Sequence, residues 1–235
     1  MIFPPISPKL KAPFQAAFRR HCHRFLATGY TAALRRIQND PDEETDSTGY
    51  ICEALEKWFR NNPQESVGFF IKDDPPVCGT DKTGKRRPRT DIVIGYAAGA
   101  RPEFCFEAKR LHRSKAVGSR YTSAVGMGCF ITGLYARQSA DAAMVGYVQT
   151  DTLEQWQGDL QNRVQDKARE LALESIDAKL SFEYAFPLEW SSTHGRQNNS
   201  SVRIFHLLLD CRRVPQLPLL EPAKPQSFPS FRCVK

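Results

Sequence analysis

The sequence lacks several features that would assign it to a specialised class of protein. No run within its 235 residues approaches the ~20 apolar residues that a membrane-spanning helix requires. The amino-terminal segment MIFPPISPKLKAPF has prolines where a signal peptide needs a continuous apolar stretch. The chain also contains no internal repeat. We therefore expect a cytoplasmic protein that does not associate with a membrane.

Cysteine is present, but not in the patterns that bind zinc or build a disulfide framework. The seven cysteines are an odd number, they are scattered along the chain, and no two form a CxxC pair. We expect reduced thiols, as is usual in a cytoplasm. Zinc-finger spacing and a recognisable helix-turn-helix are missing too, so we expect no separate sequence-reading domain.

The composition is that of one ordinary globular domain with an excess of positive charge. Hydrophobic residues make up 41% and charged residues 25% of the chain, and the formal net charge is +7. We expect a single domain over residues 1–213 and a proline-rich tail over residues 214–235. A basic balance fits a polyanionic partner such as a nucleic acid, although many basic proteins bind none.

Hydrophobic periodicity predicts a mixture of helices and strands along this domain. The first two elements are helices, and Gly29 is a possible break in the first of them. Three strands follow, and then a helix, a strand, a longer helix and two more strands. The predicted ranges, in chain order, are 13–37, the acidic cluster at 41–50 through about 61, 65–72, 92–94, 104–109, 121–138, 142–148, 152–176, 180–190 and 202–209.

The most informative stretch is residues 89–110, RTDIVIGYAAGARPEFCFEAKR, which has the pattern of two strands joined by a turn. Asp91 stands at the start of the first strand. Glu107 and Lys109 stand near the end of the second strand, and side chains two residues apart in a strand point to the same face. If the two strands pair across the turn, two carboxylates and an ammonium group converge at one end of a small sheet.

Such a constellation suits a hydrolytic metal site. Mg²⁺ commonly binds one or two protein carboxylates together with phosphate oxygens. A nearby lysine can orient a water nucleophile or stabilise a phosphodiester transition state. Asp91 followed by Glu107-Ala108-Lys109 resembles the motif of the PD-(D/E)xK nuclease superfamily, although Thr90 stands where that motif has proline.

This resemblance implies an α/β fold with a restriction-endonuclease-like core of a helix, three strands, a helix and a strand. The core would cover about residues 42–150, with an extra N-terminal helix and an extra C-terminal helix and strands. In such a fold Asp91 and Glu107 would bind Mg²⁺ or Mn²⁺. Lys109 would orient the water or stabilise the transition state.

Members of the superfamily often supply one more acid from the helix that precedes the sheet. Glu44 falls on the same helical face as the apolar Ile51, whereas Glu53 falls nearly opposite. We therefore expect Glu44 to complete the site and keep Glu53 as the alternative.

Several basic residues are candidates for binding the nucleic-acid backbone, either in the loop that leads into Asp91 or just after Lys109. The residues expected to contact phosphates are Lys85, Arg86, Arg87, Arg89 and Arg113. For His194 and Arg196, in a polar segment near the end of the domain, two interpretations stay open. They reach a phosphate, or they are exposed connecting residues.

The function that the resemblance implies is a Mg²⁺-dependent endonuclease that hydrolyses phosphodiester bonds of DNA. The layout resembles nuclease subunits of prokaryotic anti-phage defence systems, so we expect a helicase or ATPase as a protein partner. The alternative is a catalytically silent nucleic-acid-binding subunit that keeps the nuclease fold as a scaffold. In a third interpretation the Glu-Ala-Lys arrangement is a coincidence in a basic protein.

Overall fold

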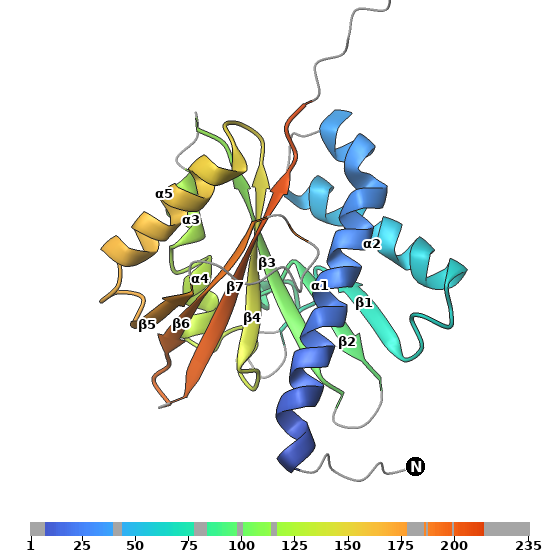
Figure 1. Cartoon of the computed structure of the whole chain (residues 1–235), viewed down its shortest axis with the longest axis horizontal. Coiled ribbons are helices and arrows are strands. Elements are labelled where there is room, and N and C mark those ends of the chain that lie inside the picture. Colours follow the sequence, from blue (N-terminus) through green and yellow to red (C-terminus); the bar gives the residue numbers. More distant parts are fainter. Residues whose placement is uncertain are drawn as a thin grey trace, which may run out of the picture.

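Two N-terminal helices and a seven-stranded mixed sheet form the body of this mixed α/β protein (Figure 1). A computed structural model describes residues 8–39, 44–77, 84–97, 101–113, 117–177, 186, 188–198 and 200–213, so the expected tail lies outside the described residues. The helices are α1 (Pro8–Asn39), α2 (Glu44–Asn61), the short 3₁₀ turn η1 (Gly84–Arg86), α3 (Val117–Tyr121), α4 (Met127–Ile131) and α5 (Leu153–Asp166). The strands are β1 (Phe69–Asp73), β2 (Ile92–Tyr96), β3 (Glu103–Leu111), β4 (Asp141–Val148), β5 (Leu173–Asp177), β6 (Glu189–Gly195) and β7 (Ser201–Asp210).

The sheet has the order β1-β2-β3-β4-β7-β6-β5, with β3, β4 and β7 parallel and all other neighbours antiparallel. Helices α1 and α2 cover one face, and α3, α4 and α5 cover the other, as Figure 1 shows. Each face has its own hydrophobic core. In the part of the chain that is described, no helix combines the length and apolarity needed to cross a membrane.

Strand β3 is buried on both faces of the sheet. Phe106 and Ala108 contribute to the core under α1 and α2, whereas Leu111 contributes to the core under α3, α4 and α5. Because side chains alternate along a strand, Glu107 and Lys109 share the face of Leu111. The two charged residues therefore project toward the side of the sheet that α4 covers.

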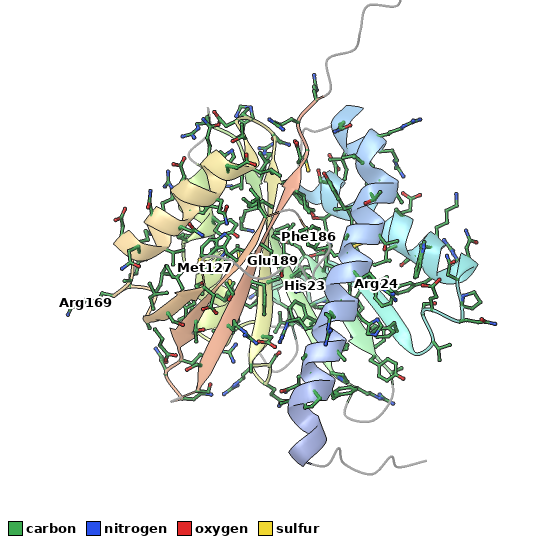
Figure 2. The ribbon with its side chains drawn as sticks, in the orientation of Figure 1. His23, Arg24, Met127, Arg169, Phe186 and Glu189 are labelled. Carbon is green, nitrogen blue, oxygen red and sulfur yellow. The ribbon has the colours of Figure 1, made fainter. Side chains whose placement is uncertain are left out.

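Helix α1 is continuous through Gly29, so the predicted break is wrong. A Cβ atom at Gly29 would lie 2.8 Å from the carbonyl oxygen of Ile51 in α2. Glycine here therefore allows the two helices to approach closely. Helix α1 also contacts the sheet through a buried polar pair, in which Nδ1 of His23 lies 2.9 Å from Oε1 of Glu189 in β6 (Figure 2).

The helix predicted over residues 121–138 is wrong in its extent, because the chain forms the two short helices α3 and α4 with turns around them. A Cβ atom at Gly126 would lie 2.3 Å from the carbonyl oxygen of Tyr121, so the backbone folds back on itself there. Gly133 follows α4 with a φ of +72°, a left-handed conformation that commonly terminates a helix.

The C-terminal elements differ from the predicted ranges as well. Helix α5 begins after Thr152, which forms a capping box with Gln155, but it ends at Asp166 and not near residue 176. The chain then turns through Ala172, whose φ is +46°, into the edge strand β5. Strand β6 lies later than the predicted range 180–190, of which residues 180–185 and 187 are outside the described part. At the other edge, β1 begins at Phe69 because turns precede it.

The contact at Gly29 predicts opposite effects of alanine at two helical glycines. Gly29→Ala forces a Cβ atom against the Ile51 carbonyl, a clash of the kind that costs ~1–3 kcal/mol. Gly49→Ala in α2 meets no atom within 4 Å, so it should gain helix propensity of up to ~1 kcal/mol. Because Gly29→Ala makes the same propensity gain, urea unfolding should show it to be less stable than Gly49→Ala by ~1–3 kcal/mol. Equal stability of the two variants would contradict the close packing of α1 on α2.

Candidate active site

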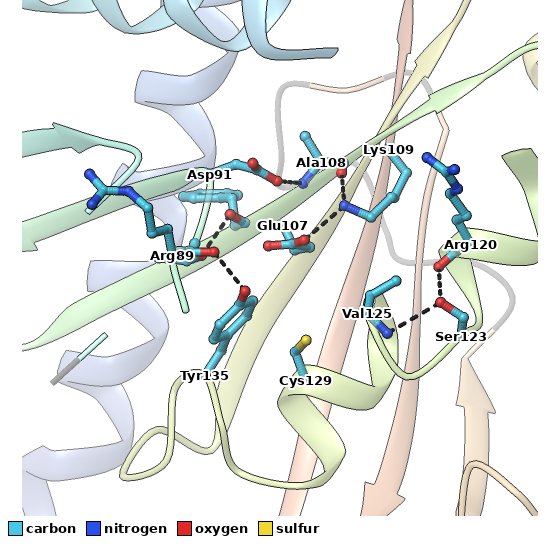
Figure 3. Close-up of polar contacts among 12 residues, drawn as sticks. Arg89, Asp91, Glu107, Ala108, Lys109, Arg120, Ser123, Val125, Cys129 and Tyr135 are labelled. Carbon is cyan, nitrogen blue, oxygen red and sulfur yellow. Dashed lines mark hydrogen bonds and ion pairs between the residues drawn. The ribbon is translucent and has the colours of Figure 1, made fainter. Parts of the chain in front are cut away.

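The structure brings Asp91, Glu107 and Lys109 together, as the sequence predicts for a paired hairpin. Ile92 pairs with Phe106, so Asp91 stands next to the register position of Glu107 (Figure 3). The ammonium group of Lys109 donates hydrogen bonds to Oε1 of Glu107 at 2.8 Å and to the carbonyl oxygen of Ala108 at 2.6 Å. Glu107 is 5% and Lys109 7% exposed, so this ion pair is almost enclosed.

Just before β2, the backbone moves away from β3, and two side chains there form the hydrogen bonds to β3 in place of backbone groups. Oδ2 of Asp91 accepts a hydrogen bond from the Ala108 amide at 2.6 Å, and the Thr90 hydroxyl donates to the Phe106 carbonyl at 3.1 Å. The divergence arises because residues 88–91 pair instead with residues 74–77 through backbone hydrogen bonds. The carboxylate of Asp91 is thereby fixed against the centre of β3.

Two further residues at this site, Cys129 and Tyr135, were missed by sequence reasoning, which placed them only within the helix predicted over residues 121–138. Tyr135 donates its hydroxyl hydrogen to the carbonyl oxygen of Arg89 at 2.6 Å. Burial, and then the negative charge of Glu107, raise the pKa of this hydroxyl and raise the pKa of the Cys129 thiol to about 11. Both groups are therefore protonated at neutral pH and lie within the electrostatic field of Glu107.

The donor set fits a hard divalent cation that takes the rest of its coordination from water and substrate. Carboxylate oxygens, here from Asp91 and Glu107, are the ligand type that Mg²⁺ and Mn²⁺ prefer, and one or two protein carboxylates are a usual number. Across the described ranges, no group of three or more His, Cys, Asp or Glu side chains is placed to hold a metal ion. The described residues thus offer a two-carboxylate site and not a complete protein cage.

The two acids considered for the preceding helix, Glu44 and Glu53, have different outcomes. Glu44 is the first residue of α2, and its side chain lies outside the described residues. The alternative, Glu53, is exposed and forms an ion pair with Arg36 of α1 at 2.7 Å. Moreover, α2 packs on the sheet face opposite to the one from which Glu107 projects. Glu53 therefore does not belong to the site.

The basic loop before Asp91 divides into two kinds of residue. Lys85 and Arg86, in η1, are exposed to solvent. Arg87 donates to the backbone carbonyls of residues 76 and 77, and Arg89 forms an ion pair with Asp74. Only the first pair has the geometry of a phosphate-binding tip, because the guanidinium groups of the other two stabilise the ribbon that delivers Asp91.

Arg113 also differs from its expected role. Its guanidinium group lies 2.9 Å from both Asp151 and Asp159 and 5.4 Å from the ring centroid of Trp156. These contacts attach the end of β3 to the start of α5. Neutralised by two carboxylates, Arg113 is a structural connection and not a phosphate contact in this arrangement.

Neither His194 nor Arg196 is an exposed connecting residue or a free phosphate ligand, because both are buried. The guanidinium group of Arg196 donates to four backbone carbonyls, those of Phe130, Ala136, Arg137 and Ser139, at 3.0–3.3 Å. It therefore holds the loop that carries Tyr135.

His194 is part of a buried chain of hydrogen bonds whose direction can be deduced. Its Nδ1 lies 2.8 Å from the carbonyl oxygen of Leu171 and must donate. For a neutral imidazole, Nε2 then accepts from the Ser192 hydroxyl at 2.7 Å. Ser192 in turn accepts from Nε2 of His206 at 2.8 Å, and Nδ1 of His206 accepts from the Tyr121 hydroxyl at 3.0 Å. One arrangement of protons satisfies every member.

Comparisons with protein-family models, with curated proteins and with solved structures found no match. What the site can do is therefore inferred from its own residues.

The hydrogen-bond chain predicts opposite neutral tautomers, with the proton on Nδ1 of His194 and on Nε2 of His206. Burial lowers the pKa of both imidazoles below the usual value. Long-range ¹H–¹⁵N NMR spectra should show both rings neutral at pH 6, while an unfolded histidine is then partly protonated, with a pKa of ~6.5. Below that value the unfolded state binds more protons, so the stability should fall by up to ~1.4 kcal/mol per pH unit for each histidine. Protonated rings at pH 6 would refute this arrangement.

Proposed function

We propose that the protein is a metal-dependent nuclease that hydrolyses phosphodiester bonds of DNA. The observation that carries this proposal is the convergence of Asp91, Glu107 and Lys109 on one side of β3, with the ammonium group directly bonded to Glu107. The topology supports it as well. Helix α2, the antiparallel strands β1 to β3, the helices α3 and α4 and the parallel strand β4 follow the order expected for a restriction-endonuclease-like core.

Each residue has a role that follows from its chemistry. Asp91 and Glu107 would hold Mg²⁺ or Mn²⁺, which when bound lowers the pKa of a water molecule and neutralises charge at the scissile phosphate. The ammonium group of Lys109 would stabilise the negative charge that develops on the phosphate oxygens. The Ala108 amide holds the Asp91 carboxylate in place, so the acids are positioned before substrate arrives.

The basic residues support a polyanionic substrate. Lys85 and Arg86 are exposed at the tip of the loop that leads into Asp91, where they could contact the phosphates that flank the scissile bond. The net charge of +7 acts in the same direction. A role as the effector nuclease of a prokaryotic defence system, with a helicase or ATPase partner, is the part of the proposal that comes from the family resemblance alone.

The enclosure of the ion pair favours a second candidate, a catalytically silent nucleic-acid-binding subunit. A catalytic centre must admit substrate, yet Glu107 and Lys109 are only 5% and 7% exposed and are bonded to each other. For cleavage, the segment around α4 would have to admit the scissile phosphate. A silent subunit would need no such access.

Three substitutions separate the metal ligands from the lysine. Asp91→Asn and Glu107→Gln keep hydrogen-bond acceptors for Ala108 and Lys109, but they remove the charges that bind a cation. Both should lose Mn²⁺ affinity, measured by calorimetry, together with plasmid nicking. Lys109→Met should keep or increase Mn²⁺ affinity, because the ammonium group no longer competes for Glu107. It should still lose roughly a hundredfold or more in turnover.

Controls for these variants include EDTA and thermal unfolding, since Lys109→Met leaves a buried carboxylate without its cation. Nicking by the wild-type protein that persists in EDTA would exclude the metal mechanism. If the wild type binds DNA but does not nick it with Mg²⁺ or Mn²⁺, the silent subunit is the better description.

The loop tip predicts a specific effect of salt on DNA binding. Replacing Lys85 and Arg86 together by alanine should weaken binding to unrelated DNA sequences alike. It should also reduce the slope of log affinity against log salt by up to ~2, because each lost phosphate contact removes about 0.9. A matched double variant, Arg20→Ala with Arg35→Ala, removes the same charge from the exposed side of α1. An equal change of slope in both double variants would show that only net charge matters.

A further inference from the structure

We propose that Tyr135 is a positioning residue of this site, which holds the backbone that carries Asp91 through a hydrogen bond to the carbonyl oxygen of Arg89. The expected effect on activity rests on the proposed nuclease function, whereas the positioning of Asp91 rests on the geometry alone. The hydroxyl of Tyr135 lies 2.6 Å from that carbonyl, and the residue is 7% exposed. Figure 3 shows Tyr135 reaching from the segment after α4 toward the strand that bears Asp91.

Asp91 needs such an anchor because it lies where two ladders part. The backbone before Ile92 leaves β3 to pair with residues 74–77, a ribbon at the margin of the sheet. On the β3 side, the Asp91 carboxylate accepts a hydrogen bond from the Ala108 amide. The Tyr135 hydroxyl binds the same segment two residues earlier, so the carboxylate is restrained from both directions.

Tyr135 is itself held rigidly. Its amide donates to the Cys129 carbonyl at 2.9 Å, and its ring packs edge-on against Phe130 with centroids 5.9 Å apart. Arg196, from the end of β6, binds carbonyls on both sides of Tyr135 in the same loop. A planar guanidinium fork is suited to several carbonyls at once, and the loop is thereby fixed to the sheet.

The electrostatic environment excludes a different role for this tyrosine. Burial, and then the charge of Glu107, raise its pKa, so the phenol is protonated at neutral pH. A protonated phenol donates a hydrogen bond but cannot act as a general base. Because its hydroxyl hydrogen is donated to the Arg89 carbonyl, Tyr135 acts on the site through that carbonyl and not as a general base.

The test compares Tyr135→Phe with Tyr30→Phe, a matched control. Tyr30 also donates its hydroxyl hydrogen to a backbone carbonyl, that of Asp210 at 2.8 Å, but it lies in α1, away from the site. Both variants lose a hydroxyl that donates to a backbone carbonyl, so their melting temperatures should fall by similar amounts. Only Tyr135→Phe should loosen the hold on Asp91. In this variant the Ala108 amide should exchange with solvent roughly tenfold faster than in the wild type, as measured by NMR.

The same loosening should lower Mn²⁺ affinity or plasmid-nicking turnover by roughly ten- to a hundredfold, the usual effect of losing a group that supports a metal ligand. DNA affinity in the absence of metal should not change. Arg196→Lys, which keeps the charge but not the fork, should shift the same quantities in the same direction.

The outcomes for the positioning role and for the nuclease function are separable. If Ala108 exchanges at the same rate in Tyr135→Phe and Tyr30→Phe, the positioning role is wrong, whatever the activity. If the exchange rate rises but the wild-type protein neither binds Mn²⁺ nor cuts DNA, the positioning role stands and the proposed nuclease function fails.

Discussion

The alternation of side chains along β3 is the constraint on which the rest of the structure depends. Both faces of this strand are buried, so a charged side chain on either face must be neutralised inside the protein. Glu107 and Lys109 solve this problem for each other, and the Ala108 carbonyl accepts a further hydrogen bond from the ammonium group. The covering helices can then close over the pair without leaving an isolated charge, whose burial would cost several kcal/mol.

On the face of the sheet under α3, α4 and α5, backbone carbonyls accept several of the buried hydrogen bonds. Arg196 binds four of them, and the chain of hydrogen bonds that begins at Tyr121 ends at the Leu171 carbonyl. Carbonyls belong to the backbone, so such contacts fix loops and not only side chains. The segments that bear these carbonyls are therefore held to the sheet, which is the kind of support that an active site needs around it.

Sequence patterns identified the structural features that depend on neighbouring residues and missed contacts between residues far apart in the chain. The hairpin of β2 and β3 and the buried strand β4 follow directly from short apolar runs and turn residues, and with them the convergence of Asp91 and Glu107. Tyr135 and Arg89 are 46 positions apart, and nothing in their spacing indicates a contact.

The basic residues show the same limit. Arg86 and Arg87 are adjacent and chemically identical, yet one is exposed and the other binds backbone carbonyls. Arg113 was predicted to contact phosphate because its charge is visible in the sequence, whereas its two acidic partners in the region of α5 are set by the tertiary fold. The charges can be counted from a sequence, but the residue with which each charge pairs cannot be identified from it.

The buried contacts of Glu189 and of Glu107, both within the described part of the chain, differ in a way that bears on function. His23 and Glu189 come from α1 and β6, and the rings of Phe104 and Phe205 pack edge-on against the imidazole with centroids 5.3 and 5.2 Å away. Their contact joins a helix to the sheet, so the burial of these two polar groups has a structural role.

Glu107 and Lys109, in contrast, are two positions apart on one strand, so their contact joins no separate elements. Two apolar side chains would fill the same positions at no electrostatic cost, and such replacements often stabilise a protein. Architecture alone therefore gives no reason for this pair. Its position beside the carboxylate of Asp91 is consistent with the proposed function, in which two acids would hold a metal ion and the ammonium group would act on the phosphate.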